Sequence, residues 1–222
     1  LIFAFVYILM IFIATGKKFY FLSGVGGTAL AFIGGYHLFN HVRVRVSIWK
    51  DPFQDFLGGG YQIALGMFAM ANASWFGVGL GNGYGAEIPL VAMDMMIIPI
   101  MEEFGMIFSF LLILVCISCF VMFLNISSAL HDGFYKLIAI GLGSAYILQV
   151  FLTVGGSTKF IPMTGVTLPL ISYGGSSILS TIICFSIIQG LYVLRKEKPQ
   201  RRRPVEKLNR RRQAADKRRV HG

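Results

Sequence analysis

The stretch Phe76-Gly-Val-Gly-Leu-Gly-Asn-Gly-Tyr-Gly85 leads through a short Ala-Glu-Ile-Pro segment to Asp94, which lies within a run of methionines and isoleucines. Glycines at every second position have no helical period, so they predict an irregular segment rather than a spanning helix. The chain on both sides is hydrophobic enough to cross a membrane. A carboxylate at the edge of a bilayer is costly unless it is solvated or functional, so Asp94 is the first candidate for a functional residue.

Five hydrophobic runs around this stretch predict transmembrane helices. A hydrocarbon core of ~30 Å needs about 20 helical residues, and backbone groups in lipid must pair within their own segment, which favours helices over strands. The sequence therefore predicts an all-α, polytopic membrane helix bundle in residues 1–194. The first run is short, and we expect its outer end to be missing. The predicted spans are about 1–15, 21–39, 104–124, 134–154 and 170–194.

The positive charge of the chain is concentrated in its last 28 residues. The net charge is +10, and residues 195–222 carry 13 Lys/Arg against 3 Asp/Glu, so the tail accounts for all of it (13 − 3 = 10). Basic residues directly after a span are retained in the cytoplasm, which places the loops at 40–103 and 155–169 outside. We expect the tail to be disordered and to contact anionic lipids, or else a cytosolic partner, rather than nucleic acid.

The outer loop at 40–103 is too long to be a simple connector, and loops of this length are usually functional. Within it, Tyr61–Phe76 is uncharged and apolar, and we expect a helix that lies at the interface or dips into the bundle. The spacing of Cys116 and Cys119 resembles a redox pair, but within a continuous apolar helix the two cysteines are better explained as small apolar filler.

Four motifs in order resemble the SEDS family, the FtsW/RodA/SpoVE group of cell-wall glycosyltransferases. The hallmark is Pro162-Met-Thr-Gly-Val-Thr-Leu-Pro-Leu-Ile-Ser-Tyr-Gly-Gly-Ser-Ser177. The other three lie upstream, at the family's spacings: Arg45 seven residues before Pro52 with Gly60-Tyr61-Gln62 following, then Gly77-x-Gly79-x-Gly81, then Pro89 five residues before Asp94 with Glu102-Glu103-Phe104-Gly105 beyond.

The resemblance implies ten spans, of which this chain supplies the last five as the C-terminal half. It implies a bacterial plasma-membrane enzyme whose site faces outside and which polymerises lipid II, a disaccharide-pentapeptide on undecaprenyl diphosphate, into glycan strands. It further implies a class B penicillin-binding protein as partner within the elongation, division or sporulation machinery. The family's catalytic aspartate falls on Asp94. Two departures concern the pocket: Met93 and Met95 replace the usual Thr and Phe, and Val78 replaces a common lysine.

One carboxylate is sufficient for joining two sugars when the leaving group is a diphosphate. Asp94 would act as general base toward the 4-hydroxyl of the acceptor, and attack opposite the diphosphate inverts the anomeric centre. Burial among methionines would raise its pKa. The alternative role of Asp94 is to bind a divalent cation, Mg²⁺ or Mn²⁺, that bridges the diphosphate.

The remaining candidates for substrate binding each have a simpler explanation. Arg45 and Lys159 could hold the diphosphate, or anchor their loops at the interface. Glu102 could bind substrate, although an acid near a helix N-terminus is favoured by the dipole alone. Gly79 and Gly81 could form a backbone nest for phosphate, or a hinge. Ser176 lies in a stretch of small residues that favours helix packing over chemistry.

The sequence thus predicts an inverting peptidoglycan glycosyltransferase, with residues 1–222 alone expected to be inactive. A lipid II flippase and an inactive membrane scaffold of the cell-wall machinery are the alternatives. A position of Asp94 near the surface, rather than in mid-bilayer, favours chemistry over translocation.

Overall fold

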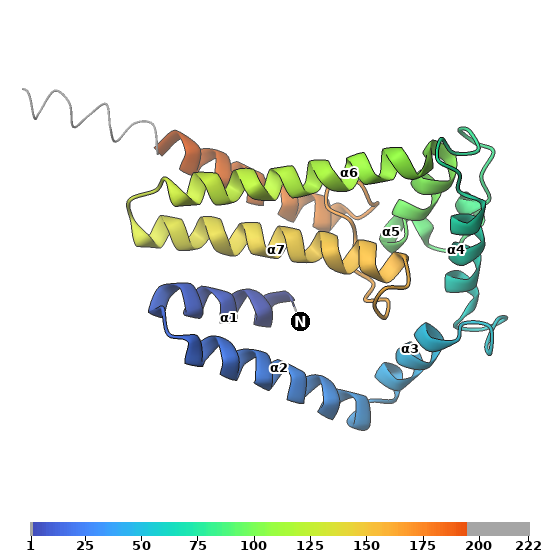
Figure 1. The fold of residues 1–222 in the computed structure, drawn as a ribbon, viewed down its shortest axis with the longest axis horizontal. Helices are drawn as coiled ribbons and strands as arrows, with labels where there is room; N and C mark the ends of the chain where they lie inside the picture. The colour runs from blue at the N-terminus through green and yellow to red at the C-terminus, as the bar shows by residue number, and fades with distance from the viewer. Residues whose placement is uncertain (1, 195–222) are drawn as a thin grey trace, which may run out of the picture.

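The computed structural model describes residues 2–194, and this part of the chain contains helices and no strand (Figure 1). The predicted tail at 195–222 lies outside the described residues. Three long helices form the centre of the bundle: α6 (Ile97–Ser128), α7 (Gly133–Ser157) and a last helix, Gly175–Leu194. Their shared core contains Phe123, Tyr146 and Ile188, each at most 6% exposed. The polytopic all-α prediction is confirmed.

Two further helices extend the bundle on one side. α1 (Ile2–Thr15) packs against α7, and α2 (Lys18–Leu38) packs against α1. Small residues permit both contacts: a Cβ on Gly141 would lie 2.8 Å from the Met10 sulfur, and one on Gly24 would lie 2.5 Å from Ile8. Neither α1 nor α2 contains a buried residue, so both expose apolar faces.

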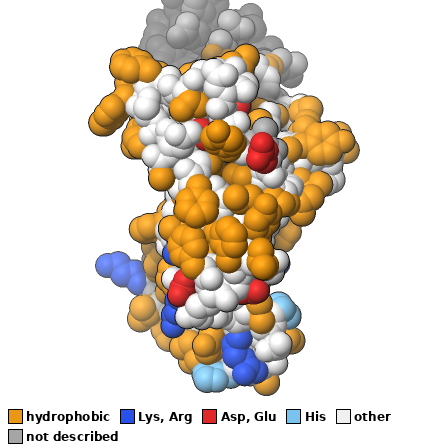
Figure 2. All heavy atoms as spheres, turned by 90° about the vertical axis from the view of Figure 1, so that its right-hand side faces the viewer, with side chains coloured by type: hydrophobic (Ala, Val, Ile, Leu, Met, Phe, Trp, Pro, Cys, Tyr) orange, Lys and Arg blue, Asp and Glu red, His pale blue; other side chains and the backbone are white. Residues whose placement is uncertain are grey.

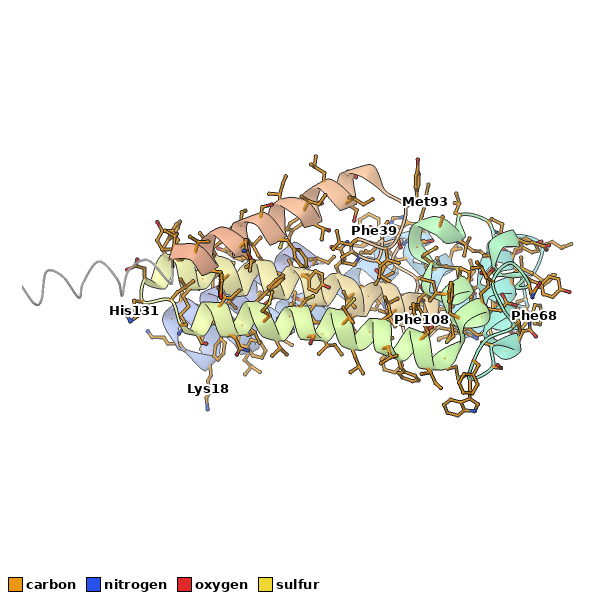
Figure 3. All side chains as sticks on the ribbon, turned by 90° about the horizontal axis from the view of Figure 1, so that it is seen from above. Lys18, Phe39, Phe68, Met93, Phe108 and His131 are labelled. Carbon is orange, nitrogen blue, oxygen red and sulfur yellow. The ribbon has the colours of Figure 1, made fainter. Side chains whose placement is uncertain are left out.

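Four helices of residues 2–194 are long and apolar enough to cross a membrane, and α1 is a shorter apolar helix of 14 residues. The turns that follow α1 and α6 lie at the same end of the bundle, as Lys18 and His131 show, whereas Phe68 lies at the opposite end (Figure 3). The segment between α2 and α6 closes that opposite end (Figure 1).

This connecting segment is largely helical. It contains α3 (Asn40–Lys50), α4 (Tyr61–Asn72), the 3₁₀ turn η1 (Gly85–Glu87) and the four-residue α5 (Val91–Asp94). In α3, the alternation of valine and arginine is a strand-like pattern, but a lone strand beside a membrane has no partner, whereas a helix pairs its own backbone. The apolar helix expected from Tyr61 ends at Asn72.

Hydrophobic side chains gather on the outer surface of this segment (Figure 2). Beneath them, α4, α5 and the start of α6 share a second core that brings Ala69, Met95 and Ile98 together, each at most 3% exposed. Gly66 makes this packing close, because a Cβ there would lie 2.6 Å from the Met95 side chain. The exposed large hydrophobic residues of this segment include Phe53, Leu57, Tyr61, Phe68, Trp75, Phe76, Leu80 and Tyr84.

The helix α6 is broken at Gly105, whose φ of 92° and ψ of 168° are accessible essentially only to glycine. The break frees backbone groups, and the 74–79 loop pairs with them on both sides. The four hydrogen bonds run from Val78 N–H to Glu102 O (2.9 Å), Gly79 N–H to Glu103 O (3.1 Å), Met106 N–H to Ser74 O (3.1 Å) and Ile107 N–H to Trp75 O (3.4 Å).

Candidate active site

Asp94 is the last residue of α5, which is too short to be stable by itself. The helix follows Leu90, which adopts the left-handed conformation (φ 56°). Two hydrogen bonds from other parts of the chain hold it. Ser157, at the end of α7, donates its hydroxyl to the Asp94 carbonyl (2.8 Å), and the Tyr173 N–H donates to the Ala92 carbonyl (2.7 Å). The position of Asp94 is therefore set by α7 and by the loop before the last helix.

The Asp94 side chain opens onto a cavity of about 200 Å³ between α3, α4 and the loop after α7. Its carboxylate is half-buried, and a Cβ on Gly165 would lie 3.9 Å from Asp94 Oδ2. The other oxygen, Oδ1, is buried without a hydrogen-bond partner. The cavity is lined by Arg45, Ile48, Gly59, Gln62, Ile63, Asp94, Met163 and Gly165.

Burial raises the pKa of Asp94 above its ordinary value. Three weaker effects oppose this: a hydrogen bond to its own backbone, the side-chain amide of Gln62 and the positive charge of Arg45, each of which lowers the pKa. Desolvation is the largest effect, so the carboxylate of Asp94 is a stronger base than that of an exposed aspartate.

Arg45 lies on α3 and joins the Asp94 cavity to a second one. Its Nη1 donates to the Met163 carbonyl (3.3 Å), and its guanidinium is otherwise exposed. The second cavity, of about 480 Å³, is also lined by Arg45 and Met163, but its other walls are mostly apolar: Phe32, His41, Val42, Val46, Leu152, Ile161, Pro162 and Thr164. The Arg45 guanidinium therefore borders both the Asp94 cavity, which has charged and polar walls, and the second, mostly apolar cavity.

Four of the residues considered for substrate binding do not line the Asp94 cavity. The carbonyl of Lys159 accepts a hydrogen bond from the Trp49 indole (3.0 Å), which ties the loop after α7 to α3. Ser176 is exposed in the first turn of the last helix. Gly79 and Gly81 belong to the loop that packs against α6. We leave these four out of the proposed site.

Glu102 is also absent from the cavity, because its side chain is fully buried beneath the glycine-rich loop. Asn72 donates to one carboxylate oxygen (2.9 Å) and the Gly85 N–H donates to the other (2.6 Å). A Cβ on Gly83 or Gly85 would lie 2.9 Å from Glu102 Oε2, so both glycines are needed for this approach. Glu102 holds the loop to α6 rather than facing a substrate.

Six of the eight residues that line the cavity were not among the sequence-based candidates, and Gln62 and Gly165 are two of them. Both lie inside motifs that carry the family resemblance, yet spacing along the chain gave no reason to place either beside Asp94. Their proximity arises from the packing of α4 and of the loop after α7 around α5.

A bundle of long apolar helices with a half-buried carboxylate at one end defines a multi-pass membrane protein with a polar site near the membrane boundary. The chain belongs to the FtsW/RodA/SpoVE family of cell cycle proteins, whose profile matches residues 1–197.

Individual relatives agree with this assignment. "Peptidoglycan glycosyltransferase RodA" of Mycobacterium tuberculosis (strain H37Rv) is 37% identical over 182 residues, covering 82% of this chain and 39% of the relative. "Probable peptidoglycan glycosyltransferase FtsW" of Enterococcus hirae is 32% identical over 209 residues, covering 86% of this chain and 51% of the relative. The chain therefore spans about half, or less, of the length of these relatives.

The fold is also found in a solved structure, "Structural coordination of polymerization and crosslinking by a peptidoglycan synthase complex". The TM-score is 0.68 at 22% sequence identity, and the match covers 86% of this chain and 54% of the other. At this identity the match speaks for the fold alone.

Proposed function

We propose that the complete protein is a peptidoglycan glycosyltransferase that polymerises lipid II into glycan strands, with Asp94 as the general base. One observation carries the proposal: the Asp94 carboxylate faces a cavity that also contains Arg45, and burial raises its pKa. The names of the relatives support the same activity.

The two adjoining cavities suit a substrate that is polar at one end and hydrocarbon at the other. The Asp94 chamber would receive the reacting sugar hydroxyl. The guanidinium of Arg45, at the junction, would bind the diphosphate, since a guanidinium holds phosphate oxygens in a fork. The apolar chamber would take the first isoprene units of the undecaprenyl chain. This order matches the reacting centre, in which the acceptor hydroxyl meets the donor sugar, followed by the diphosphate and isoprenoid chain of the donor.

The reaction proposed here needs one base. The 4-hydroxyl of the acceptor attacks the anomeric carbon of the donor, forming the new C–O bond as the bond to the diphosphate oxygen breaks. The hydroxyl proton passes to the Asp94 carboxylate, and undecaprenyl diphosphate leaves with the electron pair. Attack opposite the leaving group inverts the anomeric centre. Arg45 would stabilise the charge that develops on the diphosphate.

For a divalent cation the chain offers Asp94 as one ligand. Among residues 2–194 no group of three or more His, Cys, Asp or Glu side chains is placed to hold a metal. Hard cations take six or more oxygen ligands, so Mg²⁺ or Mn²⁺ would reach this site together with the diphosphate and water rather than as a resident ion. Asp94 would then contribute a single oxygen to it.

We further propose that the site faces the outside of the bacterial plasma membrane, with the basic tail in the cytoplasm, and that the complete protein acts with a class B penicillin-binding protein. Cationic residues after the last span support this orientation. The shared fold with a synthase complex described as coordinating polymerization and crosslinking supports such a partner.

The test is glycan-strand formation from purified lipid II by the complete protein with its partner, comparing wild type with Asp94→Asn. We expect polymer from the wild type and none from the variant, with partner binding and thermal stability preserved in both. Equal polymerisation by the two proteins would remove Asp94 from the chemistry. If neither makes polymer, lipid II translocation and a scaffolding role become the better explanations. Residues 1–222 alone should make none.

A further inference from the structure

Two buried polar atoms in the Asp94 cavity lack a hydrogen-bond partner: Asp94 Oδ1 and Gln62 Nε2. One is an acceptor and the other a donor, and both residues line the same small cavity. Buried polar atoms are nearly always paired in folded proteins, so two complementary unpaired atoms in one cavity call for an explanation.

The helices that carry these atoms are held at a fixed distance. Gln62 is the second residue of α4, and Asp94 is the last residue of α5. Directly after Asp94, Met95 is fully buried, and its side chain occupies the space left by Gly66 of α4. Ala64 of α4 is also fully buried, so α4 cannot rotate about its axis without disturbing close packing.

The two carboxylate oxygens of Asp94 have different surroundings. Oδ1 is buried, whereas Oδ2 lies on the side of Gly165, where the absence of a side chain leaves space. A proton acceptor works best when one oxygen is fixed and the other is directed at the reacting group. Hydrogen bonds in a site without substrate are often long or poorly aligned and tighten when substrate binds.

We propose that Gln62 is a positioning residue: in the substrate-bound protein its Nε2 donates to Asp94 Oδ1 and so directs Oδ2 at the acceptor hydroxyl. This inference rests on the proposed role of Asp94 as general base. Gln62 would touch the base and not the sugars. In the structure the Gln62 amide is near enough to lower the pKa of Asp94, although Nε2 and Oδ1 do not form a hydrogen bond of regular geometry, and a closer bond would act in the same direction.

Other charged groups near Asp94 must be kept constant in any test. Arg45 of α3 lowers the pKa of Asp94. The other charged side chains on the surrounding elements are Arg43, Lys50, Asp51, Asp55, Glu87, Glu102, Glu103 and Lys159, and the titratable His41 also lies on α3. None of these is altered in the variants below, so a change in the pH profile reports on position 62.

The experiment measures polymerisation of lipid II by the complete protein and its partner as a function of pH, for wild type, Gln62→Leu and Gln62→Glu. Loss of the donor in Gln62→Leu should lower kcat about tenfold with little change in KM, and should move the acid limb of the profile to higher pH. A carboxylate in Gln62→Glu should move the limb further in the same direction, because like charges oppose ionisation of Asp94.

The matched control is Gln54→Leu, an exposed glutamine in the turn before α4 that does not line the cavity. It should retain the wild-type profile. An acid limb that stays at the wild-type pH in both Gln62 variants would overturn the proposal, whatever happens to the rate. A rise in KM with an unmoved limb would also overturn it, because Gln62 would then bind substrate directly.

Failure of this inference can be told apart from failure of the proposed function. If Asp94→Asn is inactive while the Gln62 variants keep the wild-type limb, Asp94 remains the base and Gln62 does not position it. If Asp94→Asn is as active as wild type, the catalytic assignment itself fails. Should Gln62→Leu not fold, Gln62→Glu, which keeps the size and polarity of glutamine, decides the question alone.

Discussion

Gly105 and Gly77 lie against each other at the break in α6. A Cβ on Gly105 would meet the Gly77 nitrogen at 2.6 Å, and a Cβ on Gly77 would meet the Gly105 nitrogen at 2.7 Å. Both glycines also have positive φ, 92° and 78°. Two backbones can approach this closely only when neither carries a side chain, so this pair fixes where the glycine-rich loop crosses the helix.

Substitution at this crossing should be strongly destabilising. We expect Gly105→Ala to lower the free energy of unfolding by about 3 kcal/mol, because the new methyl group adds overlap with backbone to an unfavourable φ. Thermal unfolding of the complete protein in detergent measures this. Gly81→Ala separates the two causes, since Gly81 has φ 76° but open space around it, and it should lose only about 1 kcal/mol. Equal losses at both positions would contradict the role of close packing.

Glu102 gives a second prediction about the same loop. Glu102→Ala leaves the Asn72 amide and the Gly85 N–H without their acceptor and should destabilise the protein by about 2–4 kcal/mol. Glu102→Gln should lose less, because a rotated Asn72 amide can still pair with it. The control is Glu103→Ala, since the backbone carbonyl of Glu103, not its side chain, bonds the loop. A fully stable Glu102→Ala variant would argue against this assignment.

Ser157 should affect catalysis through the backbone of Asp94. Its hydroxyl also lies 2.7 Å from the Thr153 carbonyl, so Ser157→Ala removes a donor shared by two buried acceptors. We expect a loss of about 1–2 kcal/mol in stability and a severalfold fall in kcat for lipid II polymerisation. Ser186→Ala is the control, because that hydroxyl bonds a carbonyl of its own helix. An unchanged kcat in Ser157→Ala would show that Tyr173 alone suffices to hold α5.

Arg45 should act on both substrate binding and the ionisation of Asp94. In Arg45→Ala the positive charge that lowers the Asp94 pKa is lost, so the pKa rises and the acid limb of the activity profile moves to higher pH. KM for lipid II should rise as well. Arg45→Lys keeps the charge and should keep the limb, although it loses the fork.

Arg43→Ala is the matched control for Arg45, since Arg43 lies on the same helix but donates to the His37 carbonyl outside the cavity. Arg43→Ala should keep both the wild-type KM for lipid II and the wild-type acid limb of the activity profile. An acid limb that moves equally in Arg43→Ala would show a general effect of surface charge rather than a local one.

Hydropathy predicted the bundle because helices in lipid must satisfy their own backbones, and each predicted span overlaps a helix. The start of the last one was placed too early: its helix begins at Gly175, not at residue 170. The start of α6 was placed too late: the helix begins at Ile97, not near residue 104. Pro99 lies in the first turn of α6, where proline is tolerated because its missing N–H has no partner to lose. The break in the helix falls at Gly105, and the sequence gives no sign of the loop that pairs with it there.

The site was only partly predictable. Asp94 and Arg45 were identified by chemistry and by resemblance, and the structure brings them to one cavity. Gln62 could not be found in this way, because the contact between α4 and α5 depends on Met95 filling the space at Gly66. The glycine run was open to two explanations, a phosphate nest or a hinge. Neither explanation predicts that the glycines pack against the side chain of Glu102, because the burial of this acid is not visible in the sequence.

The broken helix also has a consequence for amide hydrogen exchange. The N–H groups of Val78, Gly79, Met106 and Ile107 bond across the break, two in each direction. When the loop separates from α6, all four of these N–H groups lose their carbonyl partners, which is costly next to apolar side chains. These amides, far apart in the chain, should therefore exchange with solvent deuterium at one common rate. The glycine-rich loop would then open as a single cooperative unit rather than fraying residue by residue.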